Sequence, residues 1–295
     1  MNLKKLFLNH CKTKGLEINN NQITTIEAIN KFYYNNFDYN FFSNLFLKKD
    51  NIPGFYLQGG VGVGKTMILN FFYKNFNQTK HRLHFNEFMI SFHDFIFQNK
   101  SGKKGNIIDK FVVKLKKKYK LIYFDEFQVT NIVDAMILGS LFKKIFEENI
   151  KVIFSSNIKI NNLYKDGLQR EQFIPFIKIM KKKCFEQTLV IKEDYRKSQN
   201  NNNRYLYPLN KATSFKINKL FRKLTKNKIK KEKILFIKGR KFIIKDYYEG
   251  IVRFNFNDLC NKNIGAEDYI KIVDVCKFVL IENLPNFDDN NSNQQ

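Results

Sequence analysis

The sequence predicts an α/β protein in which helices cover both faces of a parallel sheet, followed by a small mixed α+β C-terminal subdomain. Three observations support this class. From residue 54 to about 192, short apolar runs alternate with amphipathic stretches, as expected for parallel strands joined by helices. A glycine-rich loop at 59–66 separates the first apolar run from the first amphipathic stretch. A polar tract of low complexity at 197–203 then precedes a region of shorter apolar runs.

The apolar pattern places the individual elements in order. Residues 1–50 are expected to be largely helical, because their apolar residues recur at helical spacing. The residues that show this spacing are Ile26, Ile29, Phe32 and Tyr33. Strands are expected at 55–58, 82–85, 121–124, 151–155 and 188–191, and helices at 65–76, 87–98, 132–148 and 171–182. Beyond the polar tract, short strands are expected at 234–237, 242–244 and 251–254.

This order of elements divides the chain into four segments. They are an N-terminal helical segment (1–50), an α/β core (51–196), a mixed lid-like subdomain (197–285) and a tail (286–295). The tail is rich in Asn, Gln and Asp and has no apolar residue after Phe287, so it is expected to be disordered.

The chain is strongly basic, with 52 Lys and Arg against 27 Asp and Glu and a formal net charge of +25. This charge is compatible with a nucleic-acid or anionic-membrane partner. Codon composition is the alternative, because only seven of the basic residues are Arg and the chain is also rich in Asn, Ile, Phe and Tyr. Where Lys is the default cation, each Arg becomes a candidate for a place that needs a planar, bidentate group.

A cytoplasmic protein is expected from two further features. The four cysteines are scattered without a C-x-x-C pair, which favours reduced thiols. No apolar run approaches the ~20 residues that span a bilayer, and the basic and then apolar start of the chain is too short for a signal peptide.

The loop at 59–66 has the full G-x-x-x-x-G-K-[ST] spacing of a phosphate-binding loop between a strand and a helix. In this motif backbone N–H groups close around the phosphates, the lysine reaches the β- and γ-oxygens, and the last hydroxyl ligates Mg²⁺. The candidate nucleotide-binding residues are therefore Gly59, Gly60, Val61, Gly62, Val63, Gly64, Lys65 and Thr66, with Lys65 also catalytic and Thr66 also a metal ligand.

A second group of candidate residues follows two later strands. Asp125 and Glu126 end the apolar run Leu121–Phe124, so we expect Asp125 to hold Mg²⁺ and Glu126 to orient the attacking water. Asn157 follows the next strand and is expected to contact that water or the γ-phosphate. A solvated turn or a helix cap is the alternative for each of these three residues.

The order of the strands distinguishes between classes of nucleotide-binding protein. The expected strand 82–85 lies between the loop and the carboxylate strand, which favours the AAA+-like branch of P-loop NTPases over kinase-like and GTPase-like branches. No N-K-x-D guanine-reading motif is present, so ATP with Mg²⁺ is expected as the cofactor.

The sequence also resembles the ZapE cell-division ATPases and the related AFG-one-like (lactation-elevated) ATPases. The stretches that carry the resemblance are 60–67, 82–89, 124–130, 134–138, 163–173, 194–196, 239–240, 256–260 and 265–269. The resemblance implies an oligomeric AAA+-type ATPase with ATP bound between subunits. It makes Arg170 a candidate finger toward a neighbour's γ-phosphate and Arg196 a second sensor in its own subunit. A salt bridge to Glu171 or Asp194 is the alternative for these arginines.

The resemblance also implies the biological setting. It implies action at the bacterial division ring, or protein quality control at the inner membrane of mitochondria in a eukaryote, with a client protein as partner and peripheral membrane association. A nucleic-acid-associated ATPase such as a helicase loader is a second hypothesis, which the +25 charge would suit. The family continues past Pro285 into an arginine-rich segment that this sequence lacks, so a non-hydrolysing binding module is a third. His84 and His93 have no partner pattern for a metal site.

Overall fold

The computed structural model describes residues 2–15, 17–37, 52–99, 106–190, 206–237, 239–260 and 264–286. The chain divides into two compact units, Met1–Asn200 and Asn201–Gln295. The polar tract at 197–203, the predicted sensor Arg196 and most of the predicted tail lie outside the described residues.

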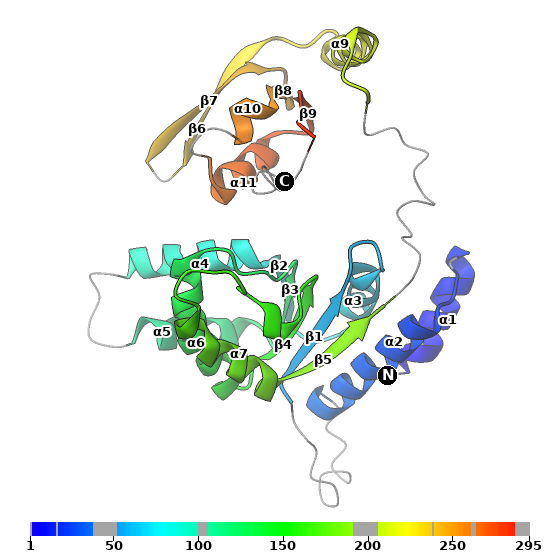
Figure 1. Ribbon diagram of the computed structural model, residues 1–295, viewed down its shortest axis with the longest axis vertical. Helices are drawn as coiled ribbons and strands as arrows, with labels where there is room; N and C mark the ends of the chain where they lie inside the picture. The colour runs from blue at the N-terminus through cyan, green and yellow to red at the C-terminus, as the bar shows by residue number, and fades with distance from the viewer. Residues whose placement is uncertain are drawn as a thin grey trace, which may run out of the picture. The chain divides into compact units, whose positions relative to one another are not determined.

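A five-stranded parallel sheet forms the centre of the first unit (Figure 1). Its strands are β1 (Gly54–Gly59), β2 (Lys80–His84), β3 (Leu121–Asp125), β4 (Lys151–Ser156) and β5 (Cys184–Leu189), and they lie in the order β2-β3-β4-β1-β5. Strand β4 lies between the strand that leads into the phosphate loop and the strand that ends in the carboxylates, so the additional strand is β4 and not the expected strand 82–85, which forms the edge strand β2. This arrangement confirms the predicted fold class, a P-loop NTPase fold of the AAA+-like branch.

Helices cover both faces of the sheet (Figure 1). They are α1 (Leu3–Lys14), α2 (Asn20–Phe37), α3 (Lys65–Asn75), α4 (Phe85–Gln98), α5 (Ile107–Lys118), α6 (Ile132–Glu147) and α7 (Arg170–Lys183), with a short 3₁₀ helix at Ile160–Asn162. The first three pack on one face, where their apolar side chains form one cluster with Phe55, Leu57 and Tyr123 of the sheet. The other four pack on the opposite face. The segment 1–50 therefore contributes α1 and α2 to the first unit.

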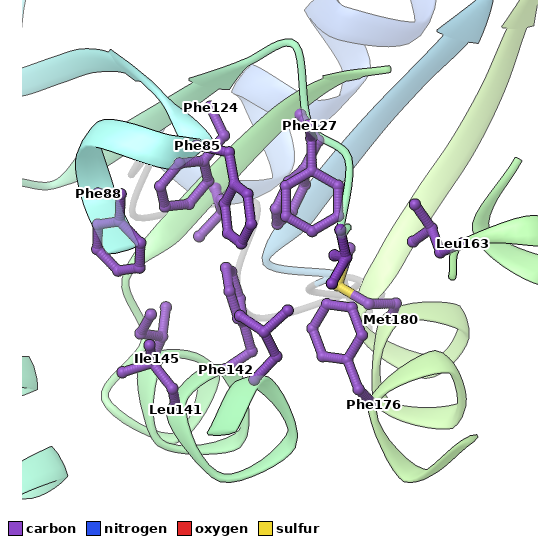
Figure 2. Close-up of a cluster of buried hydrophobic side chains, with 14 of the residues drawn as sticks. Phe85, Phe88, Phe124, Phe127, Leu141, Phe142, Ile145, Leu163, Phe176 and Met180 are labelled. Carbon is purple, nitrogen blue, oxygen red and sulfur yellow. The ribbon is translucent and has the colours of Figure 1, made fainter. Parts of the chain in front are cut away.

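Phenylalanine is the most frequent residue in the core on the face that α4 to α7 cover. Phe127, which follows the carboxylate strand, is completely buried. Its ring centroid lies 4.6 Å from that of Phe85 and 4.9 Å from that of Phe154. Phe142 of α6 and Phe176 of α7 close the same cluster at 5.4 Å from each other (Figure 2). The aromatic content of the first unit thus serves packing to a large extent, as contacts of this geometry stabilise cores.

The second unit is a small mixed α+β structure, as predicted. It contains α9 (Lys211–Thr225), β6 (Lys231–Ile237), β7 (Arg240–Tyr247), β8 (Ile251–Asn255), α10 (Phe256–Cys260), α11 (Ala266–Val275) and β9 (Phe278–Glu282). Strands β6 and β7 form an antiparallel hairpin, while β8 and β9 pair in parallel. Leu235, Ile244, Val252, Leu259 and Ile272 make up most of its buried core.

Two sequence expectations about elements were wrong. The fifth strand is Cys184–Leu189 and not 188–191, because β5 is an edge strand in which only Cys184 and Leu189 are buried, so its polar residues concealed it. Helix α5 was not expected at all. Its last turn is a run of lysines, and only Phe111 and Val112 are buried, so its apolar stripe is narrow.

Candidate nucleotide-binding site

The phosphate loop runs from the end of β1 to the start of α3. Gly62 and Gly64 have φ of +82° and +90°, which only glycine adopts readily. Gly59 approaches β5 so closely that an added Cβ would lie 2.5 Å from the carbonyl oxygen of Leu189. The loop therefore needs its glycines for backbone shape and for packing. It leads into the N-terminus of α3, where backbone N–H groups without helical acceptors favour an anion.

Lys65 joins this loop to the end of a neighbouring strand. Its side chain is buried, and Nζ donates hydrogen bonds to the carbonyl oxygens of Gly59 (2.7 Å) and Gly60 (2.6 Å). It also donates to Oδ1 of Asn157, just past β4, at 2.8 Å. The structure thus brings together two of the predicted catalytic residues, which are 92 positions apart in the chain. Val61 and Thr66 are exposed at the loop surface, whereas Val63 is buried.

Asp125 and Glu126 differ in exposure although they are neighbours. The Asp125 side chain is 4% exposed and the Glu126 side chain 78% exposed. Glu126 has a φ of +52°, an uncommon conformation for a residue with a side chain. The backbone that follows Glu126 is held, because Phe127 N–H donates to the carbonyl of Ser155 at 2.7 Å and Ser156 Oγ donates to the carbonyl of Phe127 at 2.7 Å.

Sequence reasoning gave no chemical role to two residues that contact Asp125. The Tyr123 hydroxyl donates to Asp125 Oδ1 at 3.1 Å, and Arg82 Nη2 donates to Asp125 Oδ2 at 2.5 Å. Burial, together with the negative charge of Asp125, raises the pKa of Tyr123, so its phenol stays a donor. The scarcity of arginine in the chain was the signal that could have identified Arg82.

Arg170 begins α7, and the residue before it, Gln169, has a φ of +53°. The guanidinium donates from Nη2 to the carbonyl oxygen of Asn161 at 2.9 Å, while Nε is buried without a hydrogen-bond partner. Within the described ranges no carboxylate lies at salt-bridge distance from Arg170, so the predicted alternative of a bond to Glu171 is wrong. Asp194, the other alternative partner, lies outside these ranges.

The two histidines that were considered as metal ligands make separate contacts in the structure. His93 Nε2 is 2.7 Å from Asp134 Oδ1, a contact that joins α4 to α6. His84 lies at the end of β2, with Nδ1 3.7 Å from Glu126 Oε2. In the part of the chain that the structure describes, no group of three or more His, Cys, Asp and Glu side chains could hold a metal ion.

The residues present fit Mg²⁺ bound together with a nucleotide. Magnesium at such sites uses one or two protein oxygens and takes its other ligands from phosphates and water. The Thr66 hydroxyl and the Asp125 carboxylate are oxygen donors of this kind, and the buried ammonium of Lys65 beside the loop supplies positive charge for the phosphates. No cage made entirely of protein ligands is needed.

The fold and this site define a P-loop nucleotide-binding protein with an additional strand between its two motif-bearing strands. The model of the AFG1-like ATPases matches residues 8–295, and the chain belongs to that family. Among helices in the described ranges, none is both long and apolar enough to cross a membrane.

The relatives agree with this assignment. The chain is 34% identical over 246 residues to lactation elevated protein 1 homolog B of Danio rerio, covering 79% of this chain and 49% of that protein. It is 31% identical over 242 residues to the cell division protein ZapE of Escherichia coli (strain K12), covering 81% and 64%. The chain thus spans between about half and two thirds of the length of these relatives.

The chain also aligns with proteins of solved structure. The DnaC helicase loader aligns with 59% of this chain and 92% of its own at a TM-score of 0.41 and 12% identity. DnaI aligns with 60% of this chain and 86% of its own at a TM-score of 0.39 and 18% identity.

Proposed function

We propose that this chain binds ATP with Mg²⁺ at the loop 59–66 and hydrolyses the γ-phosphate. The observation that carries the proposal is the placement of Lys65 among Gly59, Gly60 and Asn157, which puts a cation and an amide side by side where the γ-phosphate would lie. Bound Mg²⁺ would polarise the phosphate oxygens and offset their charge. Glu126, exposed beside the loop end of the sheet, would orient the attacking water, since phosphoryl transfer depends mainly on positioning and charge.

Glu126→Gln is the test of hydrolysis. The amide keeps the size of the side chain but cannot accept a proton, so the variant should bind ATP normally and turn it over at least a hundredfold more slowly. Turnover is measured by phosphate release and binding by isothermal titration calorimetry in excess Mg²⁺. The matched control is Glu147→Gln, an exposed acid on α6, which should keep the wild-type rate. Equal rates for both variants would refute the role of Glu126.

The proposal includes a second subunit. We propose that Arg170 acts on the ATP of a neighbouring copy, because its guanidinium has no carboxylate partner in the described ranges and its Nε has no acceptor. Arg170→Ala should then abolish hydrolysis and spare ATP binding. Adding Lys65→Ala subunits, which retain Arg170, should restore part of the turnover of Arg170→Ala subunits. No recovery in the mixture would contradict action between subunits.

The name of the E. coli relative supports cell division as the setting, and we propose a client protein at the division ring. By family resemblance, we propose quality control of membrane proteins as the counterpart in a eukaryote. The client can be tested with Glu126→Gln, which should hold the ATP-bound complex together with its partner during affinity purification. A client that is captured equally by Lys65→Ala, which should not bind ATP, would not be a substrate of the ATP cycle.

A second candidate function, action on nucleic acid, rests on α9 of the second unit. This helix carries five basic residues and no acidic one. Phe221 packs against Tyr248 at 5.5 Å, while Phe215 is 70% exposed on the side of the helix that also carries Lys211 and Arg222. An aromatic ring between cations can stack on an unpaired base. ATP turnover that rises with single-stranded DNA, and loses this response in Phe215→Ala, would favour this function over the first.

A further inference from the structure

Arg82 lies on β2, the edge strand beside the carboxylate strand. In the parallel register of β2 and β3, Arg82 is opposite Tyr123. Its guanidinium lies 5.4 Å from the centre of the Tyr123 ring and reaches past it to Asp125 Oδ2. The three side chains therefore form one group, on the face of the sheet that α3 covers, since Tyr73 of α3 has its ring 6.2 Å from that of Tyr123.

Both oxygens of Asp125 are engaged in this group. Oδ1 accepts from the Tyr123 hydroxyl and, at 3.2 Å, from the backbone N–H of Glu126, while Oδ2 accepts from Arg82. An ionised carboxylate that is 4% exposed is costly to keep without a compensating charge. Arg82 supplies that charge, and the carboxylate in turn raises the pKa of the arginine against the effect of its partial burial.

The same carboxylate is the proposed ligand of Mg²⁺, directly or through water. One carboxylate cannot be fully shared by a guanidinium and a divalent cation, because the two positive charges repel each other at short range. The Arg82 side chain can withdraw, since it is 36% exposed and β2 has no strand on its outer side in the described part of the sheet.

We propose that Arg82 is a positioning residue that neutralises Asp125 in the nucleotide-free protein and releases it when Mg²⁺ arrives with the nucleotide. This inference rests on the proposed ATP function. Arg82 offsets the charge of the buried carboxylate and orients it between cycles, and it sets the Mg²⁺ concentration at which the nucleotide binds tightly. A purely structural salt bridge would instead stabilise the fold and leave the requirement for Mg²⁺ unchanged.

The test compares Arg82→Gln with the wild type in the full chain. Binding of mant-ADP is followed by fluorescence as free Mg²⁺ is titrated, and thermal unfolding is measured in EDTA by circular dichroism. The variant should unfold about 5 °C lower, because Asp125 loses its counter-charge. The Mg²⁺ concentration that gives half of the maximal increase in mant-ADP affinity should also be roughly tenfold lower in the variant. This factor is the effect of removing one positive charge about 6 Å from a divalent ion in a water-like dielectric.

The matched control is Arg240→Gln. Arg240 forms the same kind of pair in the second unit, with Nη2 2.8 Å from Oδ2 of Asp268, whose side chain is also 4% exposed. This variant should lose stability and keep the wild-type dependence on Mg²⁺. Arg82→Lys, which retains the charge, should stay close to wild type in the same titration and serves if Arg82→Gln does not fold.

The outcomes separate the two proposals. A wild type that binds mant-ADP with Mg²⁺, together with an Arg82→Gln variant that needs as much Mg²⁺ or more, would overturn the role of Arg82 alone. An Arg82→Lys variant with a tenfold lower requirement would overturn it as well, because charge would not be the cause. A wild type that binds no mant-ADP at any Mg²⁺ concentration would overturn the proposed function and the inference together.

Discussion

Replacing Lys151 with Met is expected to stabilise the protein at neutral pH, although the change removes a hydrogen bond. Lys151 opens β4 and is 3% exposed, and its Nζ donates to Asn149 Oδ1 at 2.5 Å. Burial in the core lowers its pKa from 10.5 to about 8. The charged form is therefore less favourable in the folded protein than in the unfolded chain.

The magnitude follows from the two pKa values. The fall from 10.5 to about 8 corresponds to roughly 3 kcal/mol in the free energy of unfolding, at about 1.4 kcal/mol for each tenfold change. Below pH 8 both states carry the proton, so the folded protein bears the full penalty. Between pH 8 and 10.5 the unfolded chain still holds the proton that the folded protein has released, so this penalty disappears as pH rises.

The assay is urea unfolding of the wild type and of Lys151→Met, followed by far-ultraviolet circular dichroism because the chain has no Trp. The variant should be more stable by about 3 kcal/mol at pH 7, and this advantage should fall below about 1 kcal/mol by pH 10. Buried groups that titrate at high pH, such as the Cys184 thiol, whose pKa burial raises, affect both proteins equally and cancel in the difference. Lys143→Met on the exposed side of α6 should show no such trend.

Two results would refute this reasoning. A Lys151→Met variant that is less stable than the wild type at pH 7 would mean that the ammonium is stabilised by its surroundings. A difference that stays constant from pH 7 to pH 10 would mean that Lys151 does not lose its proton in the folded state.

Two further predictions concern the phosphate loop. Gly59→Ala places a Cβ 2.5 Å from the backbone oxygen of Leu189, so we expect the free energy of unfolding to fall by roughly 1–3 kcal/mol and the calorimetric midpoint to fall with it. The control is Gly60→Ala, whose added Cβ would have its nearest neighbour at 3.9 Å and which should unfold like the wild type. Equal midpoints for the two variants would contradict this prediction. Asn157→Ala removes an acceptor of Lys65 and should slow turnover ten- to a hundredfold while changing the ATP dissociation constant less than threefold. A parallel loss of affinity would assign Asn157 to binding instead.

Local sequence features were sufficient to predict the phosphate loop and its strand and helix. The spacing of the glycines, Lys65 and Thr66 is contiguous, and the flanking apolar runs are short and well bounded, so no distant residue is needed to interpret them. The three interior strands β1, β3 and β4 were placed for the same reason, since burial on both faces makes them continuously apolar. Edge strand β5 and helix α5 were misplaced or missed because little of their surface is buried.

What the sequence determined by itself is therefore the class of protein and the identity of its motif residues, because these depend on short-range spacing and on the period of apolar residues. Tertiary structure alone decided which of the motif residues meet. The strand order puts β4 beside β1, so Asn157 reaches Lys65, and it puts β2 beside β3, so Arg82 reaches Asp125. These pairs are 92 and 43 positions apart, a separation that no local pattern encodes.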